Sequence, residues 1–325
     1  MSRIVVSESA SLDGVTQATR RARGGVSRVL AAVLLAFVVA CAEPAPAQRA
    51  ILGDDAITIG SFDFPESVLL AELYGQAIGS RGIPVHRELA IGPRELVMPA
   101  LQRGLIELIP EYSGSALAFL GGSVSRDPGV TLDRLRAELS LRGLRPLAPA
   151  PAQNQNGFAV TASTAEELGL RTLSDLVPHA PTLRFGGPPE CALRPLCLEG
   201  LEDTYGLRFD DVVTLDAGGP LTLQALHNEF VDVALLFSSD GALDDPRLVL
   251  LEDDRGLQPP ERIVPVLHAR ALDRFGALVS PALDAVSGRL TTEELRTMNA
   301  AVASGREPAE IARAWLRRQG LIGTD

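Results

Sequence analysis

Two similar helix–turn–strand units lie far apart in the chain and point to its architecture. Residues 100–108 and residues 225–233 each have the pattern of a helix end, a tight turn and a buried strand. The first unit leads into residues 110–115 and the second into residues 237–241, both rich in hydroxyl and acidic side chains. In open α/β sheets, ligands bind beyond the carboxyl ends of the strands. The pair predicts two lobes that face one ligand, although any two strand–helix units could share this pattern.

The apolar spacing elsewhere predicts strands that alternate with helices, which indicates an α/β fold. The first strand–turn unit is expected to be a strand at 105–109 that ends at Pro110, followed by a small-residue turn. The other expected strands are 57–60, 85–89, 158–161, 183–185, 212–215, 231–237, 248–251 and 264–268. The expected helices begin near Pro65 and cover 93–103, 198–205, 221–228, 281–289, 291–303 and 308–319.

Two segments read as crossings between the lobes. Residues 144–156 contain three prolines followed by four alternating glutamines and asparagines, and residues 252–260 end in a proline pair. We therefore expect residues 56–150 and 257–325 to form lobe 1 and residues 151–256 to form lobe 2. Two crossings give a two-lobed α/β protein with a hinge.

The first 40 residues read as a targeting segment rather than as part of the fold. Arginines 20, 21, 23 and 28 precede a short apolar run at 29–40, which is too short to span a membrane comfortably. Small residues before Cys41 resemble a bacterial lipobox, so Cys41 is expected to carry lipid and to begin the mature chain, with 41–55 as a tether. The alternatives are an ordinary secretory signal with an incidental cysteine, and a twin-arginine signal at Arg20-Arg21.

Charge and cysteine content narrow the function further. The formal net charge of −11 argues against nucleic acid as a partner. The absence of lysine removes Schiff-base chemistry and the lysine of a phosphate-binding loop. Cys191 and Cys197 are close enough in sequence to predict a disulfide outside the cytoplasm. They do not predict a zinc site, because no nearby histidine completes a ligand set.

Several short motifs occur in order over nearly the whole chain beyond residue 56. They are Ile59-Gly60-Ser61 with Phe64 and Glu66, residues 110–115, residues 187–190, residues 237–241, and residues 251–254 before Pro259 and Pro260. Together they resemble the osmoprotectant-binding lipoproteins of ABC importers, which bind glycine betaine, carnitine and choline. The resemblance implies a two-lobed periplasmic-binding-protein fold (type II) with two crossover strands. It also implies permease and ATPase partners and no cofactor.

The resemblance further implies a ligand with a quaternary ammonium group, which is held by aromatic faces because it cannot donate hydrogen bonds. Tyr112 lies in the matching motif, and Phe62 or Phe64 adds a face. Asn156 stands where relatives carry tyrosine and Arg94 where they carry threonine, so the cage looks depleted. The ligand-binding candidates are Ser61, Phe62, Phe64, Arg94, Tyr112, Ser113, Asn156, Arg194, Ser238, Ser239 and Asp240.

Other interpretations of these residues remain open at this point. Tyr112 could be ordinary packing, Asp240 could cap a turn, and Arg194 could anchor the cysteine loop. The changed cage also allows a non-quaternary ligand, or a sensor or interaction protein on the same fold. An enzyme is the weaker hypothesis: the four histidines fall in no metal or nucleophile motif, and only Glu111 and Asp240 offer an acid pair.

Overall fold

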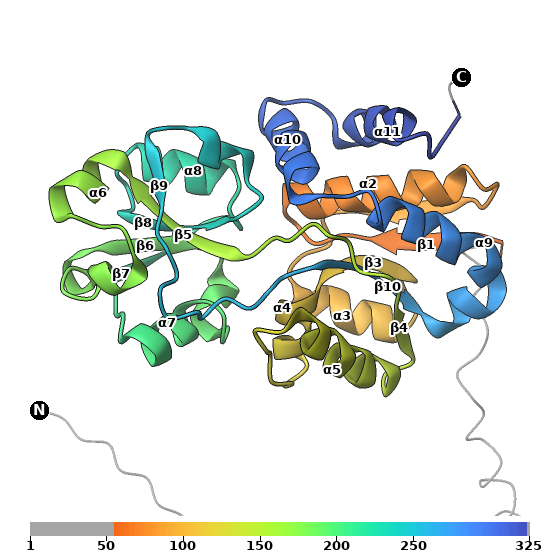
Figure 1. Ribbon diagram of the computed structural model, residues 1–325, viewed down its shortest axis with the longest axis horizontal. Helices are drawn as coiled ribbons and strands as arrows, with labels where there is room; N and C mark the ends of the chain where they lie inside the picture. The colour runs from red at the N-terminus through yellow and green to blue at the C-terminus, as the bar shows by residue number, and fades with distance from the viewer. Residues whose placement is uncertain (1–54, 324–325) are drawn as a thin grey trace, which may run out of the picture. The chain divides into compact units, whose positions relative to one another are not determined.

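The computed structural model describes residues 55–323, which contain two mixed five-stranded sheets. The predicted signal segment, the lipidated Cys41 and all of the tether except residue 55 lie outside the described residues. Figure 1 shows each sheet with helices on both faces, and two extended segments that connect the sheets. Among the described residues, no helix has the length and apolar composition to cross a membrane.

The sheet of lobe 1 has the strand order β2-β1-β3-β10-β4. Its strands are β1 (Ile57–Gly60), β2 (Val85–Glu88), β3 (Leu108–Tyr112), β4 (Leu144–Pro146) and β10 (Ile263–His268). Its helices are α2 (Pro65–Gly79), α3 (Arg94–Gln102), α4 (Ser113–Phe119), α5 (Pro128–Ser140), α9 (Ala269–Ser287), α10 (Thr292–Ala303) and α11 (Pro308–Arg318). Because helices cover both faces, the central strands β1 and β3 are buried along their whole length.

The sheet of lobe 2 has the order β7-β6-β8-β5-β9, which places its strands in the same relative arrangement. Its strands are β5 (Asn156–Thr161), β6 (Arg184–Gly187), β7 (Asp211–Thr214), β8 (Val233–Phe237) and β9 (Leu248–Leu250). Its α-helices are α6 (Ala162–Leu168), α7 (Leu198–Tyr205) and α8 (Pro220–His227). Short 3-10 helices include η4 (Pro189–Leu193) and η5 (Gly241–Asp244). In each sheet, one antiparallel strand supplied from beyond a crossing, β10 or β5, pairs with the central strands.

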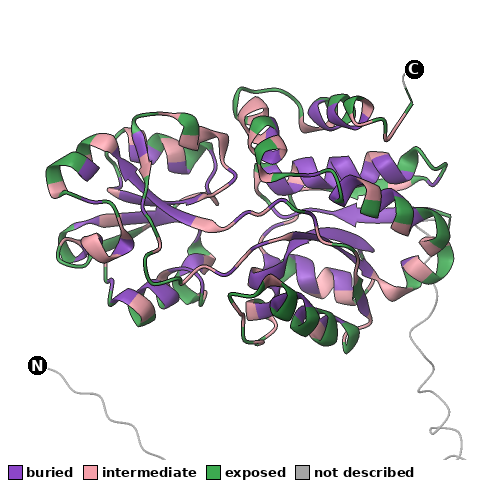
Figure 2. Cartoon of the chain, in the orientation of Figure 1, coloured by how far each residue is buried: buried purple, intermediate pink, exposed green. Residues whose placement is uncertain are grey.

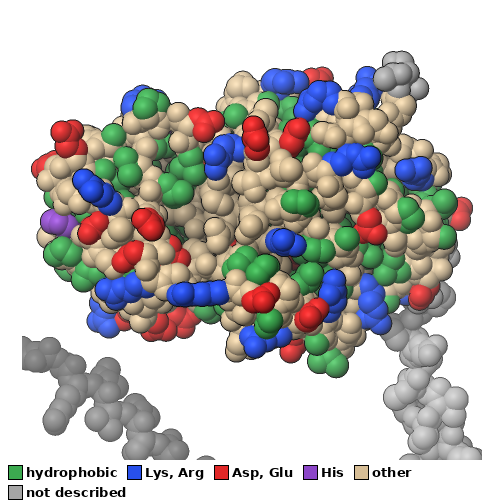
Figure 3. Space-filling view, in the orientation of Figure 1, with side chains coloured by type: hydrophobic (Ala, Val, Ile, Leu, Met, Phe, Trp, Pro, Cys, Tyr) green, Lys and Arg blue, Asp and Glu red, His purple; other side chains and the backbone are tan. Residues whose placement is uncertain are grey.

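The hydrophobic core divides as the sheets do. One large cluster fills lobe 1 and includes the fully buried Tyr74 and Trp315. Two smaller clusters lie in lobe 2, one containing Phe158 and Phe185 and the other containing Leu226. In Figure 2 the buried residues follow the strands and the inward sides of the helices. In the view of Figure 3, arginines and acids are interspersed over both lobes, so that face carries no extended patch of one sign.

The two connecting segments touch each other where they pass between the sheets. The Asn154 backbone N–H donates to the Glu261 carbonyl at 2.8 Å, and Gln153 forms an isolated antiparallel bridge with Arg262. Lobe 2 also contacts α10 at Gly241, where an added Cβ would come within 2.5 Å of the Ala300 Cα. Only glycine allows this close approach between the lobes.

Two expected elements were wrong in their bounds. The strand expected at 105–109 runs instead from Leu108 to Tyr112, and it includes Pro110. Pro110 lies opposite Pro265 in β10, at a pair of positions where no backbone hydrogen bonds are exchanged, so neither missing N–H weakens the pairing of β3 with β10. The helix expected at 281–289 runs from Ala269 to Ser287 with Pro281 inside it.

Candidate functional site

A cavity of about 60 Å³ lies between the lobes and is lined by residues of both. Its walls come from the loop after β1, the start of α3, the end of β3, the first crossing, the loop after β6 and the end of β8. The lining residues are Phe62, Asp63, Phe64, Pro93, Arg94, Tyr112, Ser115, Asn154, Asn156, Pro188, Glu190, Cys191, Arg194, Cys197, Ala217, Leu235 and Phe237. This position, beyond the carboxyl ends of strands, is where α/β sheets bind ligands.

Four aromatic rings form a connected wall of this cavity. Phe64 lies at its centre, with ring centroids 5.8 Å from Phe62, 5.9 Å from Tyr112 and 5.3 Å from Phe237. Phe62 and Phe64 reach it from one short loop, which Ser61 holds in shape by accepting a hydrogen bond from the Ala90 N–H at 2.8 Å. Phe237 comes from lobe 2, so the aromatic wall spans both lobes.

The hydroxyl of Tyr112 donates to Glu66 Oε1 at 2.8 Å, and this carboxylate has three further donors. Asn154 Nδ2 donates to the same oxygen at 2.6 Å, while Asn299 Nδ2 (2.6 Å) and the Ser239 hydroxyl donate to Oε2. The four donors come from β3, the first crossing, α10 and the loop after β8, so the network joins both lobes and the hinge. Burial raises the pKa of Glu66, and the four hydrogen bonds partly offset that effect.

The Arg94 guanidinium forms a buried two-pronged ion pair with Glu111. Arg94 Nε lies 3.0 Å from Glu111 Oε1, and its terminal nitrogen lies 3.0 Å from Oε2. Glu111 also accepts from the Tyr112 backbone N–H, and the guanidinium stacks over the Phe62 ring at 5.0 Å. Burial lowers the pKa of Arg94, but Glu111 outweighs burial and the net shift is upward. Glu111 therefore holds two cavity residues in place, Arg94 through its guanidinium and Tyr112 through its backbone N–H.

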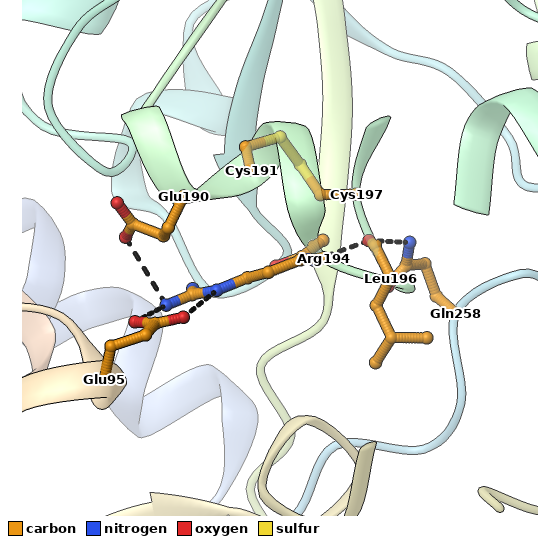
Figure 4. Close-up of a disulfide and its surroundings, with 8 residues drawn as sticks. Glu95, Glu190, Cys191, Arg194, Leu196, Cys197 and Gln258 are labelled. Carbon is orange, nitrogen blue, oxygen red and sulfur yellow. Dashed lines mark hydrogen bonds and ion pairs between the residues drawn. A yellow bond between two sulfur atoms is a disulfide. The ribbon is translucent and has the colours of Figure 1, made fainter. Parts of the chain in front are cut away.

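Figure 4 shows the loop that carries Arg194, which the Cys191–Cys197 disulfide closes. The Arg194 side chain crosses to α3 of lobe 1, where its terminal nitrogen lies 2.9 Å from Glu95 Oε2; Glu190 of its own loop is 3.5 Å away. The Leu196 carbonyl of this loop accepts hydrogen bonds from Asn156 at 2.8 Å and Gln258 at 2.9 Å, one in each connecting segment. The loop is therefore tied to both crossings and to the opposite lobe.

A second buried acid, Glu261, lies in the return crossing. It accepts from the Gly114 N–H at 2.9 Å and the Ser115 hydroxyl at 2.6 Å, at the start of α4. An added Cβ at Gly114 would come within 2.6 Å of Pro259, so this motif needs glycine for the crossing to approach. Burial raises the pKa of Glu261 to about 7, despite the opposing effects of Ser115 and Arg94.

Comparison with known proteins identifies the family of this chain. Residues 55–318 match the family model described as the substrate binding domain of the ABC-type glycine betaine transport system. This chain belongs to that family. The match covers both lobes and every residue of the cavity wall, so the family's substrate-binding domain accounts for the whole described fold.

Individual relatives agree with the family. The chain is 28% identical to a glycine-betaine-binding protein of Pseudomonas aeruginosa, over 82% of this chain and 89% of that one. It is 25% identical to the glycine betaine-binding protein YehZ of Escherichia coli, over 81% of this chain and 90% of that one. A crystal structure titled as a glycine betaine/carnitine/choline ABC transporter superposes with a TM-score of 0.64 and 25% identity, covering 82% of this chain and 99% of that one.

The fold expected from the motifs is confirmed: the structural relatives are periplasmic binding proteins of the same two-lobed α/β type. Of the candidate ligand residues, six line the cavity and five do not. The six are Phe62, Phe64, Arg94, Tyr112, Asn156 and Arg194. The five outside the lining are Ser61, Ser113, Ser238, Ser239 and Asp240.

The five remaining candidates make hydrogen bonds within the protein, four of them with backbone N–H groups. Ser61 stabilises the loop of the two phenylalanines, and Ser113 accepts from the Arg262 N–H at 3.1 Å in the return crossing. The Ser238 hydroxyl accepts from the Gln155 N–H at 2.9 Å, and Ser239 donates to Glu66. Asp240 caps η5 by accepting from the Ala242 N–H at 2.9 Å.

Several lining residues were missing from the sequence candidates. Phe237 completes the aromatic wall, and its place at the end of β8, inside a motif already quoted, was the available signal. Asn154 lines the cavity two residues before Asn156, and Asp63 sits between the two phenylalanines. Glu66 does not line the cavity but organises it; the available signals were its place in the motif already quoted and in the first turn of α2.

Proposed function

We propose that the chain is the extracytoplasmic capture component of an ABC importer, and that its two lobes close over a small solute with a quaternary ammonium group. One observation carries the proposal: a wall of four aromatic rings, three from lobe 1 and one from lobe 2, lines a cavity between the lobes. Each ring face attracts a desolvated cation by about 0.5–2 kcal/mol. Phenylalanine supplies this attraction as tyrosine does, because it comes from the ring face.

Hinge closure follows from the contacts that already cross between the lobes. Arg194 reaches Glu95 and Ser239 reaches Glu66, while Phe237 lies against Phe64. A ligand that touches the rings of both lobes binds the closed form better than the open one and shifts the equilibrium by that difference in affinity. The closed form would then dock on a permease driven by an ATPase, as the family implies.

The experiment compares two phenylalanine variants by isothermal titration calorimetry with choline and glycine betaine. Phe237→Ala removes the lobe 2 ring and is expected to weaken binding about 3–30-fold, the equivalent of one lost aromatic face. Phe230→Ala is the control, since Phe230 is 58% exposed and lies outside the cavity lining. Equal affinity of Phe237→Ala and the wild type would refute the cage, as would no binding of any quaternary ammonium.

The membrane anchor is a further part of this proposal. Cys41 would carry lipid and residues 41–55 would tether the lobes to the membrane surface. Labelling of growing cells with a clickable palmitate tests it: the wild type is expected to incorporate label and Cys41→Ala is not. Label that persists in Cys41→Ala, or is absent from the wild type, would argue for the ordinary secretory signal.

Binding without turnover is also proposed. The acid pair considered from the sequence lacks free carboxylates, since Glu111 is held by Arg94 and Asp240 caps η5. Incubation of choline with the protein, followed by proton NMR, is expected to return choline unchanged. New resonances would favour the hydrolytic alternative, and failure of every small cation to bind would favour a sensor or interaction protein.

A further inference from the structure

We infer that the cavity selects a small organic cation that carries a hydrogen-bond donor and no carboxylate, as choline does, over a zwitterion such as glycine betaine. The inference rests on the proposed function and narrows its substrate class. It follows from three features of the cavity: an excess of carboxylates, two arginines that already have partners, and one acceptor without a partner.

Carboxylates outnumber guanidiniums around the cavity. Asp63 and Glu190 line it, and Glu95 and Glu111 each contact a lining arginine directly. These four acids face two arginines, Arg94 and Arg194. Within the described chain Asp63 makes no ion pair, so its charge is available to a bound cation. A net cation is attracted by this excess, whereas the second charge of a zwitterion is repelled by it.

Both lining arginines are already paired with acids of the protein. Arg94 already spends two donors on Glu111, and both side chains are more than nine-tenths buried. Arg194 is bonded to Glu95 through two nitrogens and approaches Glu190. A ligand carboxylate at Arg94 would meet a buried guanidinium whose charge Glu111 already balances, so it gains less than it would from an unpaired arginine. No other basic side chain lines the cavity in residues 55–323.

The unpartnered acceptor is the side-chain oxygen of Asn154, a cavity residue that is 5% exposed. Its amide nitrogen donates to Glu66, whose four lone-pair sites are filled by four donors. With the amide nitrogen directed at Glu66, Oδ1 is the atom of this side chain that has no partner. A hydroxyl or N–H on the ligand would satisfy it, while a trimethylammonium group has no donor to offer.

The test uses three matched ligands and titration calorimetry on the wild-type protein. Choline and propyltrimethylammonium have the same size and charge and differ by the hydroxyl; glycine betaine adds a carboxylate. We expect choline to bind about tenfold more tightly than propyltrimethylammonium, the usual value of one buried hydrogen bond. We expect glycine betaine to bind more weakly than either. Glycine betaine binding as tightly as choline would overturn the inference, and so would equal affinities for choline and its propyl analogue.

Two asparagine variants test whether Asn154 causes the difference in affinity between choline and propyltrimethylammonium. Asn154→Leu is expected to equalise choline and propyltrimethylammonium. Asn299→Leu is the matched control, because Asn299 donates to the same Glu66 carboxylate at 2.6 Å but lies outside the cavity lining. It is expected to keep the tenfold ratio, whatever it does to stability. A ratio that is kept in Asn154→Leu, or lost in both variants, would contradict the role of Asn154.

One charge variant tests the argument that Arg94 is already paired with Glu111. Glu111→Gln frees Arg94 and is expected to raise the affinity for glycine betaine relative to choline by about tenfold or more. An unchanged ratio would contradict the argument from Arg94. If none of the three ligands binds the wild type, the proposed function itself fails; if all three bind equally, only the substrate class fails.

Discussion

Two of the polar contacts between the lobes differ in burial and in charge. On one, Glu66 of lobe 1 accepts from Ser239 of lobe 2, and both residues are at most 5% exposed. On the other, Glu95 of lobe 1 pairs with Arg194 of lobe 2, with side chains 42% and 29% exposed. The first is one buried carboxyl group surrounded by neutral donors, and the second is an ion pair in partial contact with water.

The difference indicates which contact stabilises the fold and which one can break when the lobes open. A buried carboxylate with four donors is strongly stabilised only while all of them are present, because each unpaired partner would lose its hydration as well. A partly exposed ion pair exchanges easily with water and contributes about 0–1 kcal/mol. We therefore expect the Glu66 network to govern stability and the Arg194 contact to govern closure. Four experiments follow, from the largest expected effect to the smallest.

The largest effect is expected for Glu66→Ala. It leaves four buried donors without their shared acceptor and should lower the free energy of unfolding by roughly 3–5 kcal/mol. Urea denaturation followed by circular dichroism measures this loss, with Glu95→Ala as the matched carboxylate on the exposed contact. Equal, small losses in both variants would remove the distinction between the contacts.

The buried and exposed acids should also respond to pH with opposite signs. Burial raises the pKa of Glu261 to about 7, so between pH 4.5 and 7 the folded chain keeps a proton that the unfolded chain has lost. This acid therefore lowers stability as pH rises, by roughly 3 kcal/mol at pH 8. Glu261→Gln should remove that loss.

Glu95 is expected to show the opposite dependence of stability on pH in the same measurement. Its partial burial raises its pKa, but the Arg194 hydrogen bond, a backbone hydrogen bond and the charges of Arg194 and Arg94 together outweigh burial, and the net shift is downward. Its contribution is present above the ordinary pKa and is lost as pH falls. Thermal unfolding of Glu261→Gln and Glu95→Gln from pH 4 to 8 measures both. A wild-type-like slope in Glu261→Gln between pH 4.5 and 7 would contradict the assignment.

The disulfide should have an intermediate effect. Closing the short loop 191–197 is expected to contribute about 2 kcal/mol to stability. Because the loop carries Arg194, the double variant Cys191→Ser/Cys197→Ser should also weaken choline binding several-fold, mostly through faster dissociation. Thiol titration of the denatured, unreduced protein should find neither cysteine free. Two free thiols in the wild type would show that the disulfide is not formed. An unchanged dissociation rate in the variant would show that the disulfide has no role in closure of the lobes.

The smallest effect on stability is expected for Glu95→Gln. Losing a partly exposed ion pair should change the free energy of unfolding by less than about 1 kcal/mol. The same variant should release choline faster, since the lobes lose an ion pair that joins them in this structure. Glu138→Gln is a suitable control, because Glu138 of α5 forms a partly exposed pair with Arg142, just beyond the end of that helix and outside the cavity lining. Equal release rates in the two variants would show that Glu95 has no role in closure.

Local pattern predicted much of this fold. Residues 57–60 and 198–205 form the strand and the helix expected at those positions, because apolar spacing and flanking turn residues agree there. Strand β3 was misplaced because Pro110 normally ends a strand, and only its pairing with Pro265 of β10, far away in the chain, makes it acceptable. Such a compensation has no local signature.

The cavity wall was predicted in part, for a similar reason. Phe62, Phe64 and Tyr112 lie in motifs next to strand ends, where a ligand site is expected from topology alone. Phe237 and Asn154 join them only because β8 and the first crossing bring distant segments to the same cavity. The hydroxyl-bearing candidates Ser113 and Ser238 have the residue type of a ligand contact, but the structure gives them backbone partners in the crossings.

The amino-acid sequence alone determined the two-lobed α/β class, the negative charge and the family motifs, because these depend on composition and on short-range periodicity. Only the tertiary structure decided that Glu66 would bind four donors, that both cavity arginines would be neutralised, and that the amide oxygen of the cavity residue Asn154 would be left without a partner. Those outcomes depend on which side chains meet across the lobes, and burial there sets the free-energy difference between a paired and an unpaired polar group.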